Sequence, residues 1–352
     1  MITDLRLQHF RSYDDSSFEL SPGVNIVVGP NASGKTNLLE AVLVLARGSS
    51  YRARDAELVA FEQPWARIDA DMSDGGARTV KITREPLAGK SYEISGKPYK
   101  RLNLASSLPA VLFEPNHLQL LSGSPERRRT YLDDLLEQTV GGYGLLRRQY
   151  RRALAQRNSL LKLPTHSIET QIFPWNIRLS ELAGRIVRYR CQLVAQIEAE
   201  LGALYKELSQ TSTSVAIRYD GRWPADAYET NLLKKLESSL ELDKLRGFTA
   251  SGPHREDMTV LFDGRPAAET ASRGEVRTAV LALKIMELKL MQTAHDGVAP
   301  LLLLDDVFSE LDGKRRHALT DYLAPYQTFI TTTDADLVLQ NFTNGCNVIP
   351  LS

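Results

Sequence analysis

The stretch from Gly29 to Thr36 has residue types and spacing that suit a loop wrapped around the phosphates of a nucleotide. It fits the pattern G-x-x-x-x-G-K-[ST], with Lys35 and Thr36 as its last two residues. In such a loop the backbone N–H groups point at the anion, the lysine reaches the β- and γ-phosphates, and the threonine hydroxyl binds Mg²⁺. We therefore expect ATP and Mg²⁺ as ligands and Lys35 as a catalytic residue. The residues expected to hold the nucleotide are Gly29, Pro30, Asn31, Ala32, Ser33, Gly34, Lys35, Thr36 and Asn37.

The sequence on either side of this loop supports the same interpretation. Residues 24–28 predict a buried strand, and residues 37–43 predict the beginning of an amphipathic helix. This context places the loop at the positive end of a helix dipole, where phosphate binds. The alternative is a glycine-containing turn that matches by chance, and the flanking strand and helix disfavour it.

A second acidic motif completes a nucleotide site. Residues 301–304 are four leucines, which predict a buried strand, and Asp305 and Asp306 follow them. A carboxylate at the carboxyl end of a parallel strand lies where it can hold Mg²⁺, so we expect Thr36 and Asp305 as metal ligands. We expect Asp306 to orient or deprotonate the attacking water. The alternative is a helix cap or a solvated strand end.

A third motif, Ser272-Arg273-Gly274-Glu275, opens a predicted helix. A serine hydroxyl and backbone N–H groups at a helix N-terminus form an anion site. We expect Ser272, Arg273 and Gly274 to contact a nucleotide phosphate. Ser-x-Gly-Glu is also an ordinary helix cap, and taken alone the motif does not decide between the two.

Composition narrows the class of protein. The chain of 352 residues carries 43 basic and 43 acidic residues, so it has no global positive field and any DNA surface must be a local patch. Its two cysteines lack metal-ligand spacing, which suits a reducing compartment. The first residues lack the apolar region of a signal peptide, and no apolar run is long enough to span a bilayer. We expect a cytoplasmic protein without a membrane partner.

The distance between the motifs predicts the domain organisation. Lys35 and Asp305 are far apart in the sequence yet must meet, so the core is expected to form from both ends of the chain. We expect an ATPase lobe at 1–120 plus 297–352, and an inserted, mainly helical lobe at 121–296 that carries the Ser272 motif. Alternating residues predict an antiparallel meander at 66–72, 78–83 and 91–94. Pro164 and Pro174 predict a break before a long helix over 179–208.

The basic candidates for DNA binding lie in the inserted lobe. The first group shares one face of a predicted helix and comprises Arg147, Arg148, Arg151 and Arg152, with Arg157 further along. Such a stripe neutralises phosphates without reading sequence, but it is equally a solvated face matched by nearby acids. Arg127–Arg129 form a second group, in which Arg128 is the candidate for a buried ion pair. His254 and Arg255 either contact DNA or brace the sheet.

Four stretches resemble the RecF family of bacterial DNA replication and repair ATPases. They are Leu5–Tyr13, Phe113–Pro115 with Gly123–Asp133, Ser251–Asp257, and Leu301–Asp312. The resemblance covers nearly the whole chain and implies an α/β fold: a P-loop ABC/SMC-type ATPase head with an antiparallel β subdomain and an inserted α-helical lobe.

The same resemblance implies a function. It implies an ATP-dependent homodimer, in which the phosphate loop of one copy faces the Ser272 motif of the other. It also implies slow, DNA-stimulated hydrolysis, clamping of DNA at single-strand gaps or junctions, and partnership with RecR and RecO in loading a recombinase.

Several residues depart from related ATPases, and other functions stay open. Transporter ATPases carry Glu where Asp306 stands, Gly where Arg273 stands, and a switch histidine near residues 331–333, a place that Thr332 or Thr333 could fill. Position 116 is Asn, where the RecF family usually has an acid. The alternatives are a transporter ATPase subunit, an SMC-like tethering ATPase, and a nucleotide-binding scaffold without hydrolysis. The long separation of Lys35 from Ser272 disfavours the transporter.

Overall fold

The computed structural model describes residues 1–163, 168–334, 338–340, 342 and 346–352, and it divides into two compact units. The head unit comprises Met1–Leu118 and Glu287–Ser352, and the inserted unit comprises Gln119–Met286. Both ends of the chain therefore belong to the head unit. The second boundary falls inside helix α9 (Arg273–Ala294), whereas the lobe limits that we propose, 1–120 plus 297–352 and 121–296, keep this helix whole.

The antiparallel sheet predicted for the head unit is confirmed. Its strand order is β2-β1-β4-β5-β6-β7. Alternation gives each strand one buried face and one polar face; in β4, Ala66, Ile68 and Ala70 are buried while Arg67 is exposed. The strands are β1 (Ile2–Phe10), β2 (Tyr13–Glu19), β4 (Trp65–Met72), β5 (Ala77–Thr83), β6 (Gly89–Ile94) and β7 (Lys97–Tyr99).

A five-stranded parallel sheet brings the two ends of the chain together. Its order is β14-β3-β13-β12-β8, so β3, from the beginning of the chain, lies between two strands from its end. The strands are β3 (Val24–Val28), β8 (Ala110–Phe113), β12 (Leu301–Asp305), β13 (Thr328–Thr332) and β14 (Asn347–Pro350). Parallel pairing puts the carboxyl ends of β3 and β12 at the same edge.

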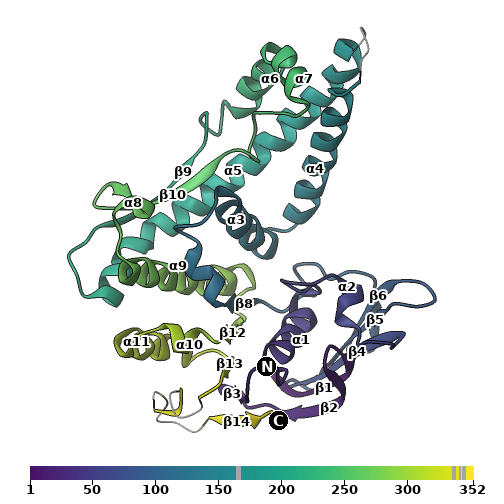
Figure 1. Ribbon diagram of the computed structural model, residues 1–352, viewed down its shortest axis with the longest axis vertical. Helices are drawn as coiled ribbons and strands as arrows, with labels where there is room; N and C mark the ends of the chain where they lie inside the picture. The colour runs from purple at the N-terminus through teal and green to yellow at the C-terminus, as the bar shows by residue number, and fades with distance from the viewer. Residues whose placement is uncertain (164–167, 335–337, 341, 343–345) are drawn as a thin grey trace. The chain divides into compact units, whose positions relative to one another are not determined.

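Helix α1 (Lys35–Arg47) follows the phosphate loop and joins the cores of the two sheets (Figure 1). Its residues Leu38–Ala46 are buried in one cluster with Leu5, Ile68, Leu303 and Phe329. The short helices of the head unit are α2 (Asp55–Leu58), α10 (Val307–Glu310) and α11 (Gly313–Leu323), and a 3₁₀ turn (Pro115–Gln119) spans the first boundary. Apolar packing of α1 against strands of both sheets fixes the loop that precedes it.

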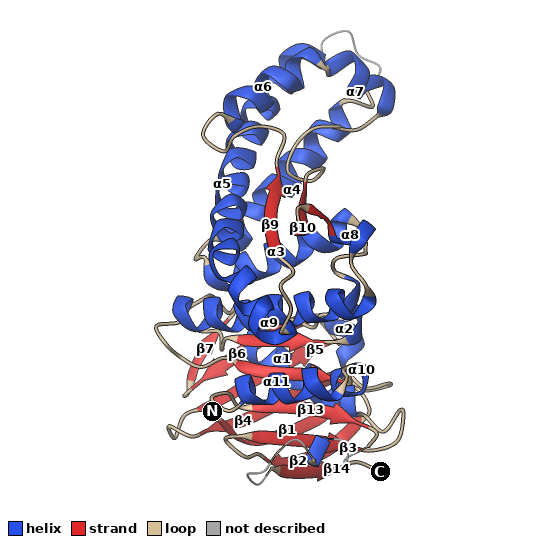
Figure 2. Ribbon diagram, turned by 90° about the vertical axis from the view of Figure 1, so that its left-hand side faces the viewer, coloured by secondary structure: helices blue, strands red, loops and turns tan. Residues whose placement is uncertain are grey.

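The inserted unit is mainly helical, with a small antiparallel sheet in the order β11-β10-β9 (Figure 2). Helix α5 packs against α4, α6 and β9. The elements are α3 (Pro125–Thr139), α4 (Tyr143–Leu160), α5 (Ile168–Ser209), β9 (Val215–Asp220), α6 (Tyr228–Ser238), α7 (Leu240–Arg246), β10 (Asp257–Phe262), β11 (Arg265–Pro266) and α8 (Ala267–Thr270).

The predicted break at Pro174 is wrong, because α5 is continuous over 42 residues and contains this proline. Pro164 lies outside the described residues. Proline removes one helical hydrogen bond, but Ile172, Asn176 and Leu179 are buried on either side of Pro174. Packing of these side chains outweighs the local preference, as it does for most helices in folded proteins.

Candidate nucleotide-binding site

The phosphate loop is held in shape by its own lysine. Lys35 Nζ donates hydrogen bonds of 2.7 Å to the carbonyl oxygens of Gly29 and Pro30. Gly34 has a φ of 100°, which favours glycine, and its carbonyl accepts a hydrogen bond of 3.1 Å from the Tyr13 hydroxyl. Lys35 is only 9% exposed. The ammonium group therefore lies inside the loop, where it could contact the phosphates of a bound nucleotide.

The loop has the features that an anion requires. A side chain at Gly29 would meet the Leu351 carbonyl oxygen at 2.5 Å and Ser33 Oγ at 2.6 Å, so only glycine fits there. Within the described part of the chain, Ser33 Oγ is a buried hydroxyl without a hydrogen-bond partner. A buried polar atom without a partner costs about 1–3 kcal/mol. A phosphate oxygen would satisfy it, so the residues present fit a nucleotide.

Thr36 and Asp305 meet although they are far apart in the sequence. The Thr36 hydroxyl donates a hydrogen bond of 3.0 Å to Asp305 Oδ1, across a separation of 269 residues. The same oxygen accepts a second hydrogen bond, of 2.7 Å, from the Thr331 hydroxyl. Tyr51 approaches Asp305 Oδ2 at 3.4 Å, and burial together with this carboxylate raises the pKa of Tyr51. The two expected metal ligands thus lie side by side.

Asp306 adopts a left-handed conformation, with a φ of 53°. Aspartate tolerates this region better than most residues. Its backbone N–H donates a hydrogen bond of 2.9 Å to Thr331 Oγ1, and its side chain is exposed. Thr331 therefore holds both acids, Asp305 through its hydroxyl proton and Asp306 through its oxygen. Thr332 bonds instead to the backbone of Asp334, and Thr333 is exposed.

A buried carboxylate, Glu40, orders two arginines beside the loop. Arg11 binds Glu40 through Nε at 2.8 Å and Nη2 at 3.0 Å, and Arg52 Nη2 binds it at 2.9 Å. Burial alone would raise the pKa of Glu40, but the hydrogen bonds from Arg11, Arg52 and Ser50 outweigh burial and lower it. Arg52 also donates to Asn37 Oδ1 at 2.7 Å. Helix α1, which follows the phosphate loop, is thereby linked to the segment at 50–52.

Ser272 caps helix α9 with reciprocal hydrogen bonds. Its N–H donates to Glu275 Oε2 at 2.8 Å, and its Oγ accepts from the Glu275 N–H at 3.3 Å. This is the capping box that the sequence also allowed. Ser272 and Arg273 are exposed. The hydroxyl proton of Ser272 takes no part in the cap, so the cap leaves it for another acceptor.

Comparison with known proteins decides the family. Residues 1–348 match the model of the RecF/RecN/SMC N terminal domain. The DNA replication and repair protein RecF of Roseiflexus castenholzii is 35% identical over 370 residues, covering 95% of this chain and 94% of the relative. The RecF of Heliobacterium modesticaldum is 34% identical, covering 94% and 92%. The chain belongs to the RecF family.

Solved structures agree with the RecF assignment. The recombination mediator protein RecF–ATPrS matches with a TM-score of 0.89 at 28% identity, covering 100% of this chain and 97% of the other. A structure of the recombination mediator protein RecF with ATP matches with a TM-score of 0.84, covering 99% of this chain and 95% of the other. An Smc head matches with a TM-score of 0.53 at 16% identity, which shows a shared fold alone. The predicted fold, an ABC/SMC-type head, is confirmed.

Within the described residues of this RecF-family chain, no group of three His, Cys, Asp or Glu side chains could hold a metal ion. Mg²⁺ in nucleotide sites is commonly bound through one or two carboxylates, substrate phosphates and water. None of the helices in the described part of the chain is long and apolar enough to cross a membrane.

The candidate DNA-binding arginines differ in their surroundings. Arg147 contacts three carboxylates, those of Asp133, Asp134 and Glu137, at 2.9–3.2 Å. Within the described residues, no ion pair is found for the last three of the group, which are exposed: Arg148, Arg151 and Arg152. The inclusion of Arg157 in this group is wrong. It is fully buried and pairs with Asp243 at 2.9 Å, because α6 and α7 cover that end of α4.

Arg128 and His254, for which the sequence allowed either DNA contact or a structural role, both make contacts within the inserted unit. Arg128 makes the ion pair that its position allowed, with Nε and Nη2 at 2.8 and 2.6 Å from the Asp257 carboxylate. His254 accepts a hydrogen bond of 2.6 Å at Nδ1 from the Tyr150 hydroxyl when its Nε2 carries the proton and donates to the Thr249 carbonyl at 3.0 Å. His254 therefore braces the inserted unit.

His254 predicts a pH-dependent stability. Burial first, and then Arg255, Arg129 and Arg190, lower its pKa to about 4 from 6.5, against the Thr249 carbonyl, which raises it. Between these values the unfolded chain binds a proton that the folded chain does not, so the free energy of unfolding falls as pH falls from 6.5. The slope is at most about 1.4 kcal/mol per pH unit for one site. The free energy of unfolding, measured by urea denaturation at pH 7, 6 and 5, should depend less steeply on pH for His254→Gln than for wild type. An equal dependence on pH in the two proteins would contradict the prediction.

Sequence reasoning missed Thr331, Glu40 and Tyr51. Thr331 could have been predicted from the sequence. A strand parallel to the acidic strand must place a residue beside Asp305, and Thr331 is its register partner. Glu40 and Tyr51 gave no signal of their own. A glutamate on an apolar helix and a tyrosine in a polar loop are both ordinary, and only the folded chain brings them to Arg52 and Asp305.

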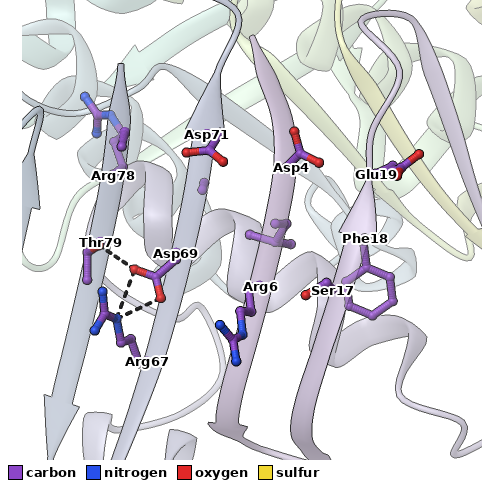
Figure 3. A pocket seen from close by; sticks show the side chains of 13 residues that line it. Asp4, Arg6, Ser17, Phe18, Glu19, Arg67, Asp69, Asp71, Arg78 and Thr79 are labelled. Atoms are coloured by element: carbon purple, nitrogen blue, oxygen red, sulfur yellow. Dashed lines mark hydrogen bonds and ion pairs between the residues drawn. The ribbon is translucent and has the colours of Figure 1, made fainter. Parts of the chain in front are cut away.

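The exposed face of the antiparallel sheet carries a shallow hollow of about 640 Å³ (Figure 3). Three carboxylates lie across it on neighbouring strands, because Asp4 is the register partner of both Glu19 and Asp71. All three side chains are exposed. Like charges directly opposite each other in a sheet destabilise it.

Asp4→Asn should therefore stabilise the protein, because it removes both repulsions at once. The expected gain in free energy of unfolding is about 0.2–1 kcal/mol at low salt, measured by urea denaturation, and smaller at high salt. Glu93→Gln is the control, since this exposed residue of β6 faces Thr79 and Pro98. A loss of stability on Asp4→Asn would contradict the prediction.

Proposed function

We propose that this chain is an ATP-dependent DNA-binding protein of recombinational repair and a slow, DNA-stimulated ATPase. In the proposed cycle, ATP joins two copies, the dimer clamps DNA at single-strand gaps or junctions, and hydrolysis releases it. RecR- and RecO-type mediators are the proposed partners in recombinase loading. Membership of the RecF family supports this proposal, as does the likeness to RecF structures described with ATP and the RecFOR pathway.

The observation that carries the proposal is the meeting of Thr36 with Asp305. It joins the phosphate loop and the acidic strand end into one site, with Lys35 buried inside the loop. We propose that Gly29–Asn37 hold the phosphates, that Thr36 and Asp305 hold Mg²⁺, and that Asp306 acts on water. Bound Mg²⁺ would supply charge neutralisation between the phosphates. Thr331 would position both acids through the hydrogen bonds described above.

We propose that Ser272, Arg273 and Gly274 bind the nucleotide of the other copy. The cap of α9 supports this, since Ser272 and Arg273 are exposed and the Ser272 hydroxyl accepts within the cap without using its proton there. For DNA, the proposal now rests on Arg148, Arg151 and Arg152 more than on Arg147, whose charge is matched by acids.

The decisive experiment measures the mass of the protein in solution with ATP, with ADP and without nucleotide. Wild type is expected to form dimers with ATP only. Lys35→Met should abolish them by removing the phosphate contact, and Ser272→Arg should abolish them while ATP still binds. The control is Thr270→Arg, which adds the same positive charge at a nearby exposed residue. A wild type that stays monomeric with ATP, or dimers that survive Ser272→Arg, would overturn the clamp.

A further inference from the structure

A pocket of about 310 Å³ lies inside the inserted unit. Helices α3, α4 and α5 and the segment before β10 line it, with four arginines and two acids among the lining residues: Arg129, Arg147, Arg151, Arg190, Glu126 and Asp133. Four positive and two negative side chains leave a formal excess of two positive charges. Pockets of this size take small ligands or single groups of larger ones.

Two of the arginines build the pocket wall and are neutralised. Arg190 is 4% exposed and binds the Asp133 carboxylate through Nε at 2.9 Å and Nη2 at 3.0 Å. Its Nη1 donates to the Pro253 carbonyl at 2.7 Å. Arg147 contacts the same Asp133 and two further acids. This buried network fixes the shape of the pocket and takes up the charge of Asp133.

The other two arginines supply the positive charge that remains. With Arg147 and Arg190 paired to acids, Arg129 and Arg151 against Glu126 leave a formal charge of plus one in the pocket. Arg129 Nη1 donates to the Glu256 carbonyl oxygen at 2.8 Å, a contact that positions the guanidinium without neutralising it. Arg151 is exposed, and no ion pair of it occurs among the described residues. Glu126 is an exposed acid of the same pocket. Arg129 comes from α3 and Arg151 from α4, so two guanidinium groups reach the pocket from different helices.

The imidazole of His254 lines the same pocket. Burial lowers the pKa of His254 most, and Arg255, Arg129 and Arg190 lower it further. Guanidinium groups bind phosphate through paired N–H donors.

We propose that this pocket binds a phosphate group of the DNA backbone between Arg129 and Arg151. This inference rests on the proposed DNA binding and pairs Arg151 with Arg129, a member of the second basic group in the sequence. DNA is favoured over a small anion because Arg148 and Arg152 are exposed and flank Arg151 in α4. A pocket flanked by further positive charges suits a chain of phosphates.

The first test compares two double variants of equal charge in the full-length protein. Arg129→Gln with Arg151→Gln removes the pocket charges, and Arg185→Gln with Arg188→Gln removes two exposed charges of α5 outside the pocket. With a duplex carrying a single-strand gap, the pocket variant should reduce the salt slope of binding by about 1, as expected for one lost phosphate contact, and the affinity about tenfold beyond the control variant. Equal effects of the two variants would overturn the proposal.

The second test uses wild-type protein and separates the possible sources of phosphate. Phenylglyoxal modification of Arg129, Arg151 and Arg188 is followed by peptide mass spectrometry with the gapped duplex or with inorganic phosphate. Protection of Arg129 and Arg151 by the duplex, with Arg188 unprotected, supports the proposal. Protection by inorganic phosphate alone would assign the pocket to a free anion and overturn the DNA assignment.

The failure of this site can be told from failure of the proposed function. If the duplex binds with ATP but leaves Arg129 and Arg151 unprotected, the pocket proposal fails while DNA binding stands. If no duplex binds under any nucleotide condition, the proposed function fails, and the DNA assignment of the pocket fails with it. Equal unfolding midpoints of the two double variants establish that lost affinity is not lost folding.

Discussion

Arg157→Met is expected to lower the free energy of unfolding by about 3–5 kcal/mol, because it leaves the Asp243 carboxylate buried without its partner. Both side chains are almost fully buried, at 0% and 1% exposure. Arg157 also donates to Asn176 Oδ1 at 2.7 Å and Thr249 Oγ1 at 2.7 Å. One guanidinium therefore satisfies groups from α5, α7 and the loop after it. Urea denaturation followed by circular dichroism measures the loss.

Two further variants test the reason for that loss. Arg152→Met changes an exposed arginine of the same helix and should alter stability by no more than about 0.5 kcal/mol. Adding Asp243→Leu to Arg157→Met removes the uncompensated charge and should recover part of the stability, since a buried pair replaced by apolar residues is often close to neutral. A single variant as stable as wild type, or a double variant less stable than the single, would contradict the explanation.

Asp305→Asn should reduce ATP hydrolysis by about 100-fold or more, the range typical for loss of one group that stabilises charge in the transition state, because it weakens the hold on Mg²⁺. The prediction rests on the proposed function. The amide oxygen of Asn can still accept the hydrogen bonds of Thr36 and Thr331, so the change removes the charge and largely spares the geometry. Steady-state hydrolysis and nucleotide binding are measured together, and ATP binding should change much less than hydrolysis.

The matched control for this change is Asp321→Asn. Asp321 is an exposed aspartate of helix α11 in the same unit, and it lies outside the four stretches that resemble the RecF family. It should hydrolyse ATP at the wild-type rate. If both variants lose activity equally, or if Asp305→Asn keeps full activity, then the charge of Asp305 has no special part in the reaction.

The site was largely predictable because its chemistry lies in short, local patterns. Lys35 and Thr36 belong to one loop, and Asp305 follows a run of leucines that must be a buried strand. Their contact follows from one rule, that parallel strands present their carboxyl ends at one edge. The roles of these residues stay predictions, but their positions follow from the fold.

What could not be predicted depends on partners distant in the sequence. Arg157 shares the helix of Arg151 and Arg152, and only Asp243 and Thr249, 86 and 92 residues away, reveal that it is buried. Periodicity also gave no account of Pro174, because a local rule for proline competes with packing that forms only in the folded unit. Arg129 was grouped with its neighbours until the pocket separated them.

The order of strands in the parallel sheet has a consequence for synthesis of the protein on the ribosome. Strand β3, which leads into the phosphate loop, pairs with β13 and β14, and both are made after the whole inserted unit. The inserted unit is a continuous segment and can fold as it emerges, as domains generally do. Until residues beyond 327 appear, the apolar strand β3 has two edges whose N–H and C=O groups lack their partners, and such edges invite aggregation. The nascent head unit therefore keeps an unpaired strand throughout the synthesis of the inserted unit.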